Sequence, residues 1–148
     1  MKISIINGPN LNLLGTRNPD IYGSTTLSDL QNKIVDKLKD SSYAPVFFQS
    51  NVEGELVNEI QSRALDCCAI ILNAGAYTHT SIAIRDAISS IKVPVIEVHI
   101  SNVYAREDFR HFSHISPVAS GIIVGFGISS YLIALDSILN NFVKKTNN

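Results

Sequence analysis

Two pairs of side chains in this sequence are suited to proton transfer. Glu97 and His99 are two residues apart in an apolar run, so their side chains would point to the same face of a β-strand. A carboxylate beside an imidazole fixes the orientation and tautomer of the ring and favours its protonated form. The pair therefore predicts a general acid. The alternative is a strand-end histidine that only hydrogen-bonds to a neighbour.

The second pair, Arg17 and Tyr22, lies in a long loop. The stretch Asn7–Gly23 reads NGPNLNLLGTRNPDIYG, and its glycines and prolines predict that no helix runs through it. Loops longer than about 12 residues are uncommon in compact domains and usually functional, so we expect an active-site lid. A guanidinium lowers the pKa of a nearby phenol from about 10, which makes Tyr22 a candidate base when the lid closes. The alternative, in which Tyr22 only packs the lid onto the sheet, stays open.

The rest of the chain alternates short apolar runs with segments of helical periodicity. This pattern predicts a parallel sheet that helices cover on both faces. Five strands with right-handed crossovers favour a flavodoxin-like three-layer α/β/α fold of strand order 2-1-3-4-5, because a Rossmann-type order needs more strands. We expect a single catalytic domain over residues 1–148. The expected strands span residues 3–6, 45–49, 68–72, 94–98 and 119–124. Of the four expected helices, the first two begin near residues 26 and 53, and the last two span residues 80–91 and 129–145.

Local signals mark two element boundaries. Thr25 or Thr26 can cap the first long helix, with Asp29 in the position of a capping box. The sequence GFGISS, at residues 125–130, predicts a close strand–helix turn. It is not a dinucleotide-binding fingerprint, because it follows the last strand. Such a fingerprint also needs a second strand that ends in an acidic residue about 20 positions further on, and the sequence has none there.

Polar side chains gather after three strands of the expected sheet. In open parallel sheets the functional site lies beyond the carboxyl ends of the strands, near the point where the strand order reverses. Strands 1, 3 and 4 would lie side by side there. A single asparagine or arginine in such a loop is usually a turn or surface residue, but the convergence of three loops predicts a site. Its candidate residues are Asn7, Asn10, Asn73, Gly75, His79, Glu97, His99, Ser101, Arg106 and Arg110.

Composition excludes several classes of function. The net charge of −1 argues against non-specific nucleic-acid binding, and no apolar run is long enough to span a membrane. A strand pattern from Lys2 leaves no room for a signal peptide, so we expect a cytoplasmic protein. Cys67 and Cys68 are adjacent, which excludes a disulfide framework and favours two small hydrophobes at the start of a strand. No spacing of histidines indicates a metal site.

A binding or signalling module with the same fold is the alternative from another class. A receiver domain needs acidic residues after strands 1 and 3, where this chain has Asn7 and Asn73. A flavodoxin needs a phosphate-binding loop after strand 1, and this chain instead has a long loop with Arg17 and Tyr22. A non-catalytic scaffold would need neither pair.

Together these stretches resemble the type II 3-dehydroquinate dehydratases over nearly the whole chain. The resemblance depends on the order and spacing of several motifs. These are NGPNLNLLGTR at 7–17, YGSTTL at 22–27, FQSN at 48–51, EGEL at 53–56, NAGAYTHTSIAIRDA at 73–87, EVHISN at 97–102 and REDFRHFS at 106–113.

The resemblance implies the anti elimination of water from 3-dehydroquinate through an enolate, giving 3-dehydroshikimate, with no metal, Schiff base or other cofactor. The pathway would be aromatic amino acid biosynthesis, or quinate breakdown with the same chemistry. By analogy, Tyr22 removes the C2 proton with Arg17 lowering its pKa, and His99, oriented by Glu97, protonates the departing C1 hydroxyl. Asn10 would help to hold a water on the enolate oxygen. The implied substrate-binding residues are Asn73, His79, Asp86, Ile100, Ser101, Arg110 and, with a less direct part in the site wall, Arg106.

The resemblance also implies a homo-oligomer, a dodecamer built from trimers, in which Asp86 reaches the site of an adjacent subunit. Three positions depart from the family pattern. Asn18 stands where Glu is usual, Val52 where His is frequent, and Ser130 where Gly is usual. We expect Asn18 to alter the dynamics of the lid and the other two to alter a local contact, with no loss of a catalytic group.

Overall fold

The fold is a single parallel sheet of five strands between two layers of helices. The computed structural model describes residues 1–142, and of Pro19 and Tyr22 only the backbone. The strand order β2-β1-β3-β4-β5 confirms the predicted flavodoxin-like order. The strands are β1 (Lys2–Asn7), β2 (Ala44–Gln49), β3 (Ala69–Asn73), β4 (Val95–His99) and β5 (Gly121–Val124).

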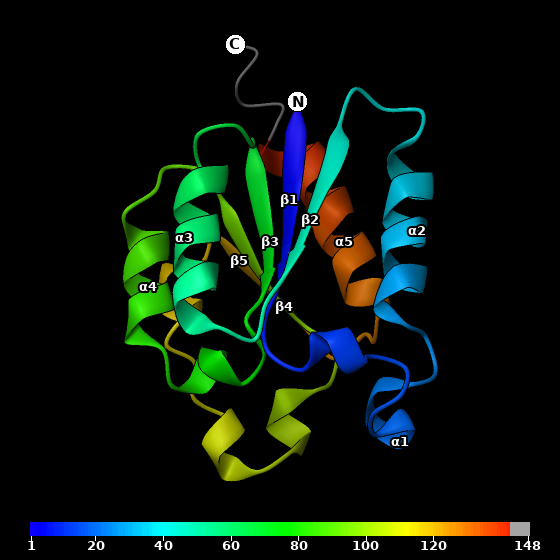
Figure 1. Ribbon diagram of the computed structural model, residues 1–148, viewed down its shortest axis with the longest axis vertical. Coiled ribbons are helices and arrows are strands. Elements are labelled where there is room, and N and C mark those ends of the chain that lie inside the picture. Colours follow the sequence, from blue (N-terminus) through cyan, green and yellow to red (C-terminus); the bar gives the residue numbers. More distant parts are fainter. Residues whose placement is uncertain (143–148) are drawn as a thin grey trace.

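Helices cover both faces of the sheet, as Figure 1 shows. On one face α2 and α5 pack over Ile3, Ile5 and Ile71, and on the other α3 and α4 pack over Ile6 and Ile70. The three central strands are buried along nearly their whole length, which explains why they read as continuous apolar runs. The helices are α1 (Pro19–Tyr22), α2 (Leu27–Leu38), α3 (Glu53–Arg63), α4 (Ile82–Ser89) and α5 (Ser129–Ser137).

Side-chain caps decide where two of these helices begin. Thr26 caps α2: its hydroxyl accepts from the Asp29 N–H at 3.1 Å, and the Asp29 carboxylate accepts from the Thr26 N–H at 2.9 Å. This confirms the capping box and selects Thr26 over Thr25. The helix that was expected from residue 80 begins at Ile82 instead, because the Ser81 hydroxyl accepts from the Ile84 N–H at 2.9 Å.

The final helix differs from its prediction over residues 129–145. It is α-helical only to Ser137, and Ile138–Phe142 continues it as a π-helical turn. Residues 143–145 of the predicted helix lie outside the described part of the chain. The side chains of Tyr131, Leu135 and Ile138 are buried, as helical periodicity requires.

The long loop after β1 contains more regular structure than its sequence predicts. No helix runs through Asn7–Gly23, but a 3₁₀ turn at Leu11–Leu13 and the short helix α1 fit between its glycines and prolines. Pro19 begins α1, where its missing N–H is harmless because the first turn of a helix leaves such groups unpaired. The glycines and prolines therefore prevent one continuous helix through the loop, but they allow short helical turns between them.

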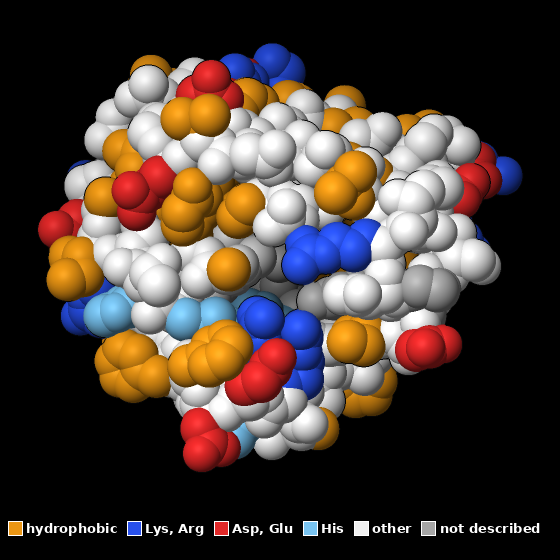
Figure 2. Space-filling view, turned by 60° about the horizontal axis from the view of Figure 1, so that its bottom comes forward, with side chains coloured by type: hydrophobic (Ala, Val, Ile, Leu, Met, Phe, Trp, Pro, Cys, Tyr) orange, Lys and Arg blue, Asp and Glu red, His pale blue; other side chains and the backbone are white. Residues whose placement is uncertain are grey.

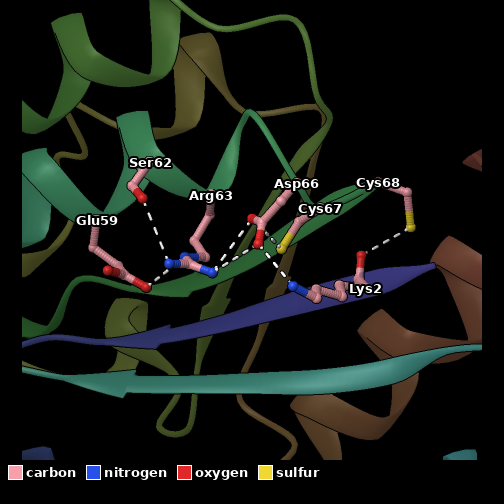
Figure 3. A network of polar contacts seen from close by, with 7 residues as sticks. All are labelled: Lys2, Glu59, Ser62, Arg63, Asp66, Cys67 and Cys68. Atoms are coloured by element: carbon pink, nitrogen blue, oxygen red, sulfur yellow. Dashed lines mark hydrogen bonds and ion pairs between the residues drawn. The ribbon is translucent and has the colours of Figure 1, made fainter.

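At the amino ends of the strands, an ion-pair network ties β1 to the end of α3 (Figure 3). Asp66 bridges Lys2 and Arg63 at 3.0 Å each, and Arg63 also pairs with Glu59 at 2.9 Å. The two cysteines precede β3 rather than open it, and Cys67 is buried. Burial, with the neighbouring Asp66 carboxylate, raises the pKa of Cys67 to about 11, so it is a protonated thiol at neutral pH. This agrees with a packing role.

Among residues 1–142, no helix is both long and apolar enough to cross a lipid bilayer.

Candidate active site

A cavity opens beyond the carboxyl ends of β1, β3 and β4, where the sequence predicts a site. Figure 2 shows this end of the molecule, where arginine and histidine side chains gather around a hollow. Most of the predicted residues line it. These are Asn10, Arg17, Asn73, His79, His99, Ile100, Ser101, Arg106 and Arg110.

Two loops meet at the floor of this cavity through backbone contact. The Gly8 N–H donates to the Asn73 carbonyl at 2.7 Å, and a Cβ on Gly8 would lie 2.5 Å from the Ala74 carbonyl oxygen. Only glycine permits this approach, which joins the ends of β1 and β3. The chain then turns through Asn10 in the left-handed region at φ 68°, and the Asn51 side chain accepts from the Asn10 N–H at 2.9 Å. Asn10 is therefore held by its backbone at the cavity wall.

Asn73 is oriented by a buried tyrosine that sequence reasoning missed. The Asn73 Nδ2 donates to the Tyr131 hydroxyl at 2.9 Å, and that hydroxyl donates to Asn7 Oδ1 at 2.6 Å. The Gly75 N–H donates to Asn73 Oδ1 at 3.1 Å. Complete burial raises the pKa of Tyr131, so its hydroxyl stays protonated. One Nδ2 proton and one Oδ1 lone pair of Asn73 are left for a ligand.

Glu97 and His99 make the predicted contact at the end of β4. Both side chains are buried, and His99 Nε2 lies 2.7 Å from Glu97 Oε1. Burial raises the pKa of Glu97, but hydrogen bonds from His99, Ser116 and Ser113 outweigh it, so the net pKa is lowered. An ionised carboxylate thus accepts from Nε2 of the ring. Among the described residues, the other nitrogen, Nδ1, has no hydrogen-bond partner.

His79 lies beside His99, but the protein binds the opposite ring nitrogen: Nδ1 in His79 and Nε2 in His99. The two rings are stacked, with centroids 6.4 Å apart and planes 19° from parallel. Burial lowers the pKa of His79, and the neighbouring His99 and Arg110 act in the same direction against the Phe112 carbonyl. In the neutral ring, Nδ1–H donates to the Phe112 carbonyl at 2.7 Å, so Nε2 is an acceptor. His79 can therefore receive a hydrogen bond from a hydroxyl group.

Three arginines from two loops make the cavity suitable for an anion. Arg110 Nε donates to Glu107 Oε2 at 2.8 Å, and Arg106 donates to the Ser101 hydroxyl at 3.2 Å. Glu107 also lies 3.7 Å from Arg106, so one exposed carboxylate holds both guanidinium groups after β4. Arg17 adds a third guanidinium from the long loop. A planar carboxylate is the ligand that such a set favours.

Two predicted residues are not brought into this set. Asp86 is exposed on α4 and does not line the cavity of its own chain, so its predicted reach into an adjacent subunit stays a prediction. The side chain of Tyr22 lies outside what the structure describes; its backbone ends α1. Whether Tyr22 and Arg17 approach each other therefore also stays a prediction.

Comparison with known proteins agrees with this geometry. The model of the family "Dehydroquinase class II" matches residues 1–139. The chain belongs to this family. This confirms the resemblance that the sequence motifs carry.

Named proteins from several organisms resemble the chain over nearly its whole length. A 3-dehydroquinate dehydratase of Dinoroseobacter shibae is 51% identical over 93% of this chain and 92% of its own length. A catabolic 3-dehydroquinase of Emericella nidulans is 53% identical over 95% and 92%. The crystal structure of a type II dehydroquinase from Butyrivibrio crossotus superposes with a TM-score of 0.92 at 46% identity, covering 95% of this chain and 98% of that one.

The departures from the family pattern have local physical explanations in two cases. Asn18 adopts φ 45°, and asparagine tolerates this left-handed conformation better than the glutamate that is usual there. The Ser130 hydroxyl donates to the His99 carbonyl at 3.1 Å and accepts from the Phe126 N–H at 3.2 Å. Ser130 thereby adds a contact behind His99 that glycine would lack. Val52 is exposed at the start of α3, and nothing in the structure explains its side chain.

Proposed function

We propose that this chain is a type II 3-dehydroquinate dehydratase, a hydro-lyase that converts 3-dehydroquinate to 3-dehydroshikimate within one catalytic domain. The observation that carries the proposal is the buried Glu97–His99 pair at the wall of a cavity that three arginines also line. The family membership and the names of the relatives support the same reaction.

The cavity suits a small anionic ketone with several hydroxyl groups. Arg17, Arg106 and Arg110 supply positive charge for the carboxylate. The neutral Nε2 of His79 accepts from one hydroxyl, and the free proton and lone pair of Asn73 serve others. We assign the backbone at Ile100 and the hydroxyl of Ser101 to the carboxylate as well.

The elimination then needs one base and one acid. The Tyr22 phenolate, favoured by the Arg17 guanidinium, takes the proton from C2, and the electrons move into the carbonyl to give an enolate. A water held by Asn10 donates to the enolate oxygen. The enolate re-forms the carbonyl as the C1–O bond breaks, and the protonated His99 gives its proton to the departing hydroxyl, which leaves as water. Glu97 keeps the ring of His99 oriented throughout.

We also propose a homo-oligomer, a dodecamer of trimers. Large apolar side chains are exposed around the edge strand β5 and the segment that follows β4, at Tyr104, Phe109, Phe112, Ile122 and Phe126. Such a patch is unusual on a monomer. Asp86 is exposed in the way that a residue contributed to a neighbour must be. Size-exclusion chromatography with light scattering would test this, and a stable active monomer would contradict it.

For the cell, we propose a cytoplasmic enzyme of the shikimate pathway of aromatic amino acid biosynthesis. Relatives named for the biosynthetic type and for catabolism have similar identities, so identity does not separate the two roles. Rescue of a dehydroquinase-deficient bacterium on medium without aromatic amino acids tests the first role. Growth on quinate tests the second.

The decisive experiment is incubation of the folded protein with 3-dehydroquinate while the absorbance of the conjugated enone product is followed. We expect a rise that depends on protein concentration, and none with substrate alone. Binding of 3-dehydroquinate without any rise would overturn the proposed reaction and favour a binding module with the same fold.

A further inference from the structure

Two serines behind the catalytic pair have no place in the mechanism above. Ser113 Oγ donates to Glu97 Oε1 at 2.9 Å, and Ser116 Oγ donates to Glu97 Oε2. With His99 Nε2, the buried carboxylate accepts three hydrogen bonds. Both of its oxygens are therefore held, and the plane of the carboxylate is fixed.

The proton of the Ser113 hydroxyl has one available direction. Its oxygen already accepts from the Ile115 N–H at 3.1 Å and from the Ser116 N–H at 2.9 Å. The hydroxyl can then only donate, and Glu97 is the acceptor. Hydrogen bonds in a chain polarise one another, so two backbone dipoles act on the carboxylate through Ser113.

The same segment holds the other histidine of the cavity. Its Phe112 carbonyl accepts from His79 Nδ1 at 2.7 Å. The segment is itself fixed, because the His114 N–H donates to the Thr78 carbonyl at 2.9 Å and Arg85 donates to the His114 carbonyl at 3.3 Å. Residues 112–116 thus supply the hydrogen-bond acceptor of His79 and also bind Glu97, the acceptor of His99.

We propose that residues 112–116 form a brace for the two histidines, in which Ser113 and Ser116 are positioning residues that keep Glu97 ionised and in the orientation that His99 needs. Neither serine lines the cavity that we assign to the substrate. The brace deepens the proposed function and rests on it for its effect on turnover, but its effect on Glu97 is independent of any substrate.

Charged groups on neighbouring elements do not replace this role. Among the described residues, those that face the pair are His79 after β3, Arg106 and Arg110 after β4, and His111 beside the small space behind the pair. None of these four residues donates a hydrogen bond to Glu97, whose described donors are His99, Ser113 and Ser116. The hydroxyls are therefore the groups to vary.

Ser116 gives the cleaner test, because its hydroxyl has Glu97 as partner while that of Ser113 also holds the turn. The titration of the Glu97 carboxyl would be followed by ¹³C NMR, with Glu97→Gln to assign the signal, and kcat and KM would be measured in parallel. In Ser116→Ala we expect the Glu97 titration to move to higher pH. Because a hydrogen bond to a charged group is lost, kcat should fall roughly tenfold, with KM within about twofold of wild type.

Matched variants separate this role from packing. Ser116→Thr and Ser116→Val have the same shape and differ in the hydroxyl, so Thr should restore both the titration and kcat, and Val should not. Ser120→Ala, on the same connection to β5 and exposed, should behave as wild type. Unchanged titration in Ser116→Ala, or equal behaviour of the Thr and Val variants, would overturn the brace. If wild-type protein does not turn over 3-dehydroquinate, the proposed function fails while the titration still decides about the brace.

Discussion

The two ring nitrogens of His99 have different surroundings, and this difference suits the ring to the proposed role of general acid. Nε2 is bound to a buried carboxylate, whereas Nδ1 is left for a ligand at the cavity wall. A general acid needs both conditions, because an unfixed ring would offer its proton in many directions. The spacing of Glu97 and His99 predicted the contact, since alternation along a strand is a local rule.

Replacement of His99 by alanine should abolish most turnover without unfolding the protein. General acid catalysis contributes roughly 10²- to 10⁴-fold, so we expect kcat to fall within that range. The measurement is steady-state kinetics beside circular dichroism. The kcat of Glu97→Gln should fall less, because the amide oxygen of glutamine still accepts a hydrogen bond from His99. A His99→Ala variant with normal kcat would mean that another group protonates the leaving hydroxyl.

Tyr22→Phe should lose most turnover and still bind 3-dehydroquinate, because the change removes a proton acceptor and leaves the cavity wall intact. Kinetics and calorimetric binding measure the two properties separately. Tyr104→Phe is the matched control, since Tyr104 is exposed and does not line the cavity. Normal turnover in Tyr22→Phe would show that the base lies elsewhere.

At the scale of elements, the site depends on where strands end and helices pack. Gly8 and Gly75 let the turns after β1 and β3 touch, and Tyr131 reaches from α5 through the core to the asparagines at those same ends. The strand ends could be predicted from the sequence because apolar runs stop there. The role of Tyr131 could not, because a tyrosine within the apolar stripe of a helix looks like any other core residue.

Tyr131→Phe should lower both stability and substrate binding. It removes the hydroxyl that partners the buried Asn7 Oδ1 and Asn73 Nδ2, and an unsatisfied buried polar group costs about 1–3 kcal/mol. Urea unfolding should show this loss, and KM should rise because the Gly75 N–H alone then orients the Asn73 amide. Tyr43→Phe is a control for removing a tyrosine hydroxyl, as none of the described contacts uses that hydroxyl. Equal stability of the two variants would contradict the buried network.

At the scale of the molecule, composition and pattern predicted the layers, the strand order and the edge of the sheet that carries the site. They missed Ser113 and Ser116, which lie on a connection without periodicity, so that nothing local marks their contact with Glu97. The predicted role of Asp86 involves a second subunit, and the predicted role of Tyr22 depends on where its side chain lies. Neither follows from the fold of one chain.

Acidification should destabilise the folded protein in two stages. His79 has a lowered pKa in the folded state, so below about pH 6.5 the unfolded chain binds a proton that the folded chain does not, and the free energy of unfolding falls. Glu97, also lowered, adds a loss below its ordinary value of 4.5. Urea unfolding from pH 8 to about 3 measures both, at roughly constant salt.

His79→Gln is the variant that separates the first stage, since surface carboxylates with lowered pKa values, such as Asp66 and Glu107, act only in the second. We expect it to flatten the pH dependence between about 6.5 and 5. An unchanged slope there would mean that His79 does not contribute.

The position of the two cysteines makes the lid accessible to spectroscopy. Both lie before β3, at the end of the sheet away from the cavity, and burial raises the pKa of each thiol. The thiolate is the nucleophile that attacks a maleimide, so both native cysteines should react slowly at neutral pH. A cysteine introduced at the exposed Asp20, within α1, should take up a fluorophore in preference to them. A change of that fluorescence on addition of 3-dehydroquinate would report the predicted closure of this loop over the cavity, and a constant signal would contradict it.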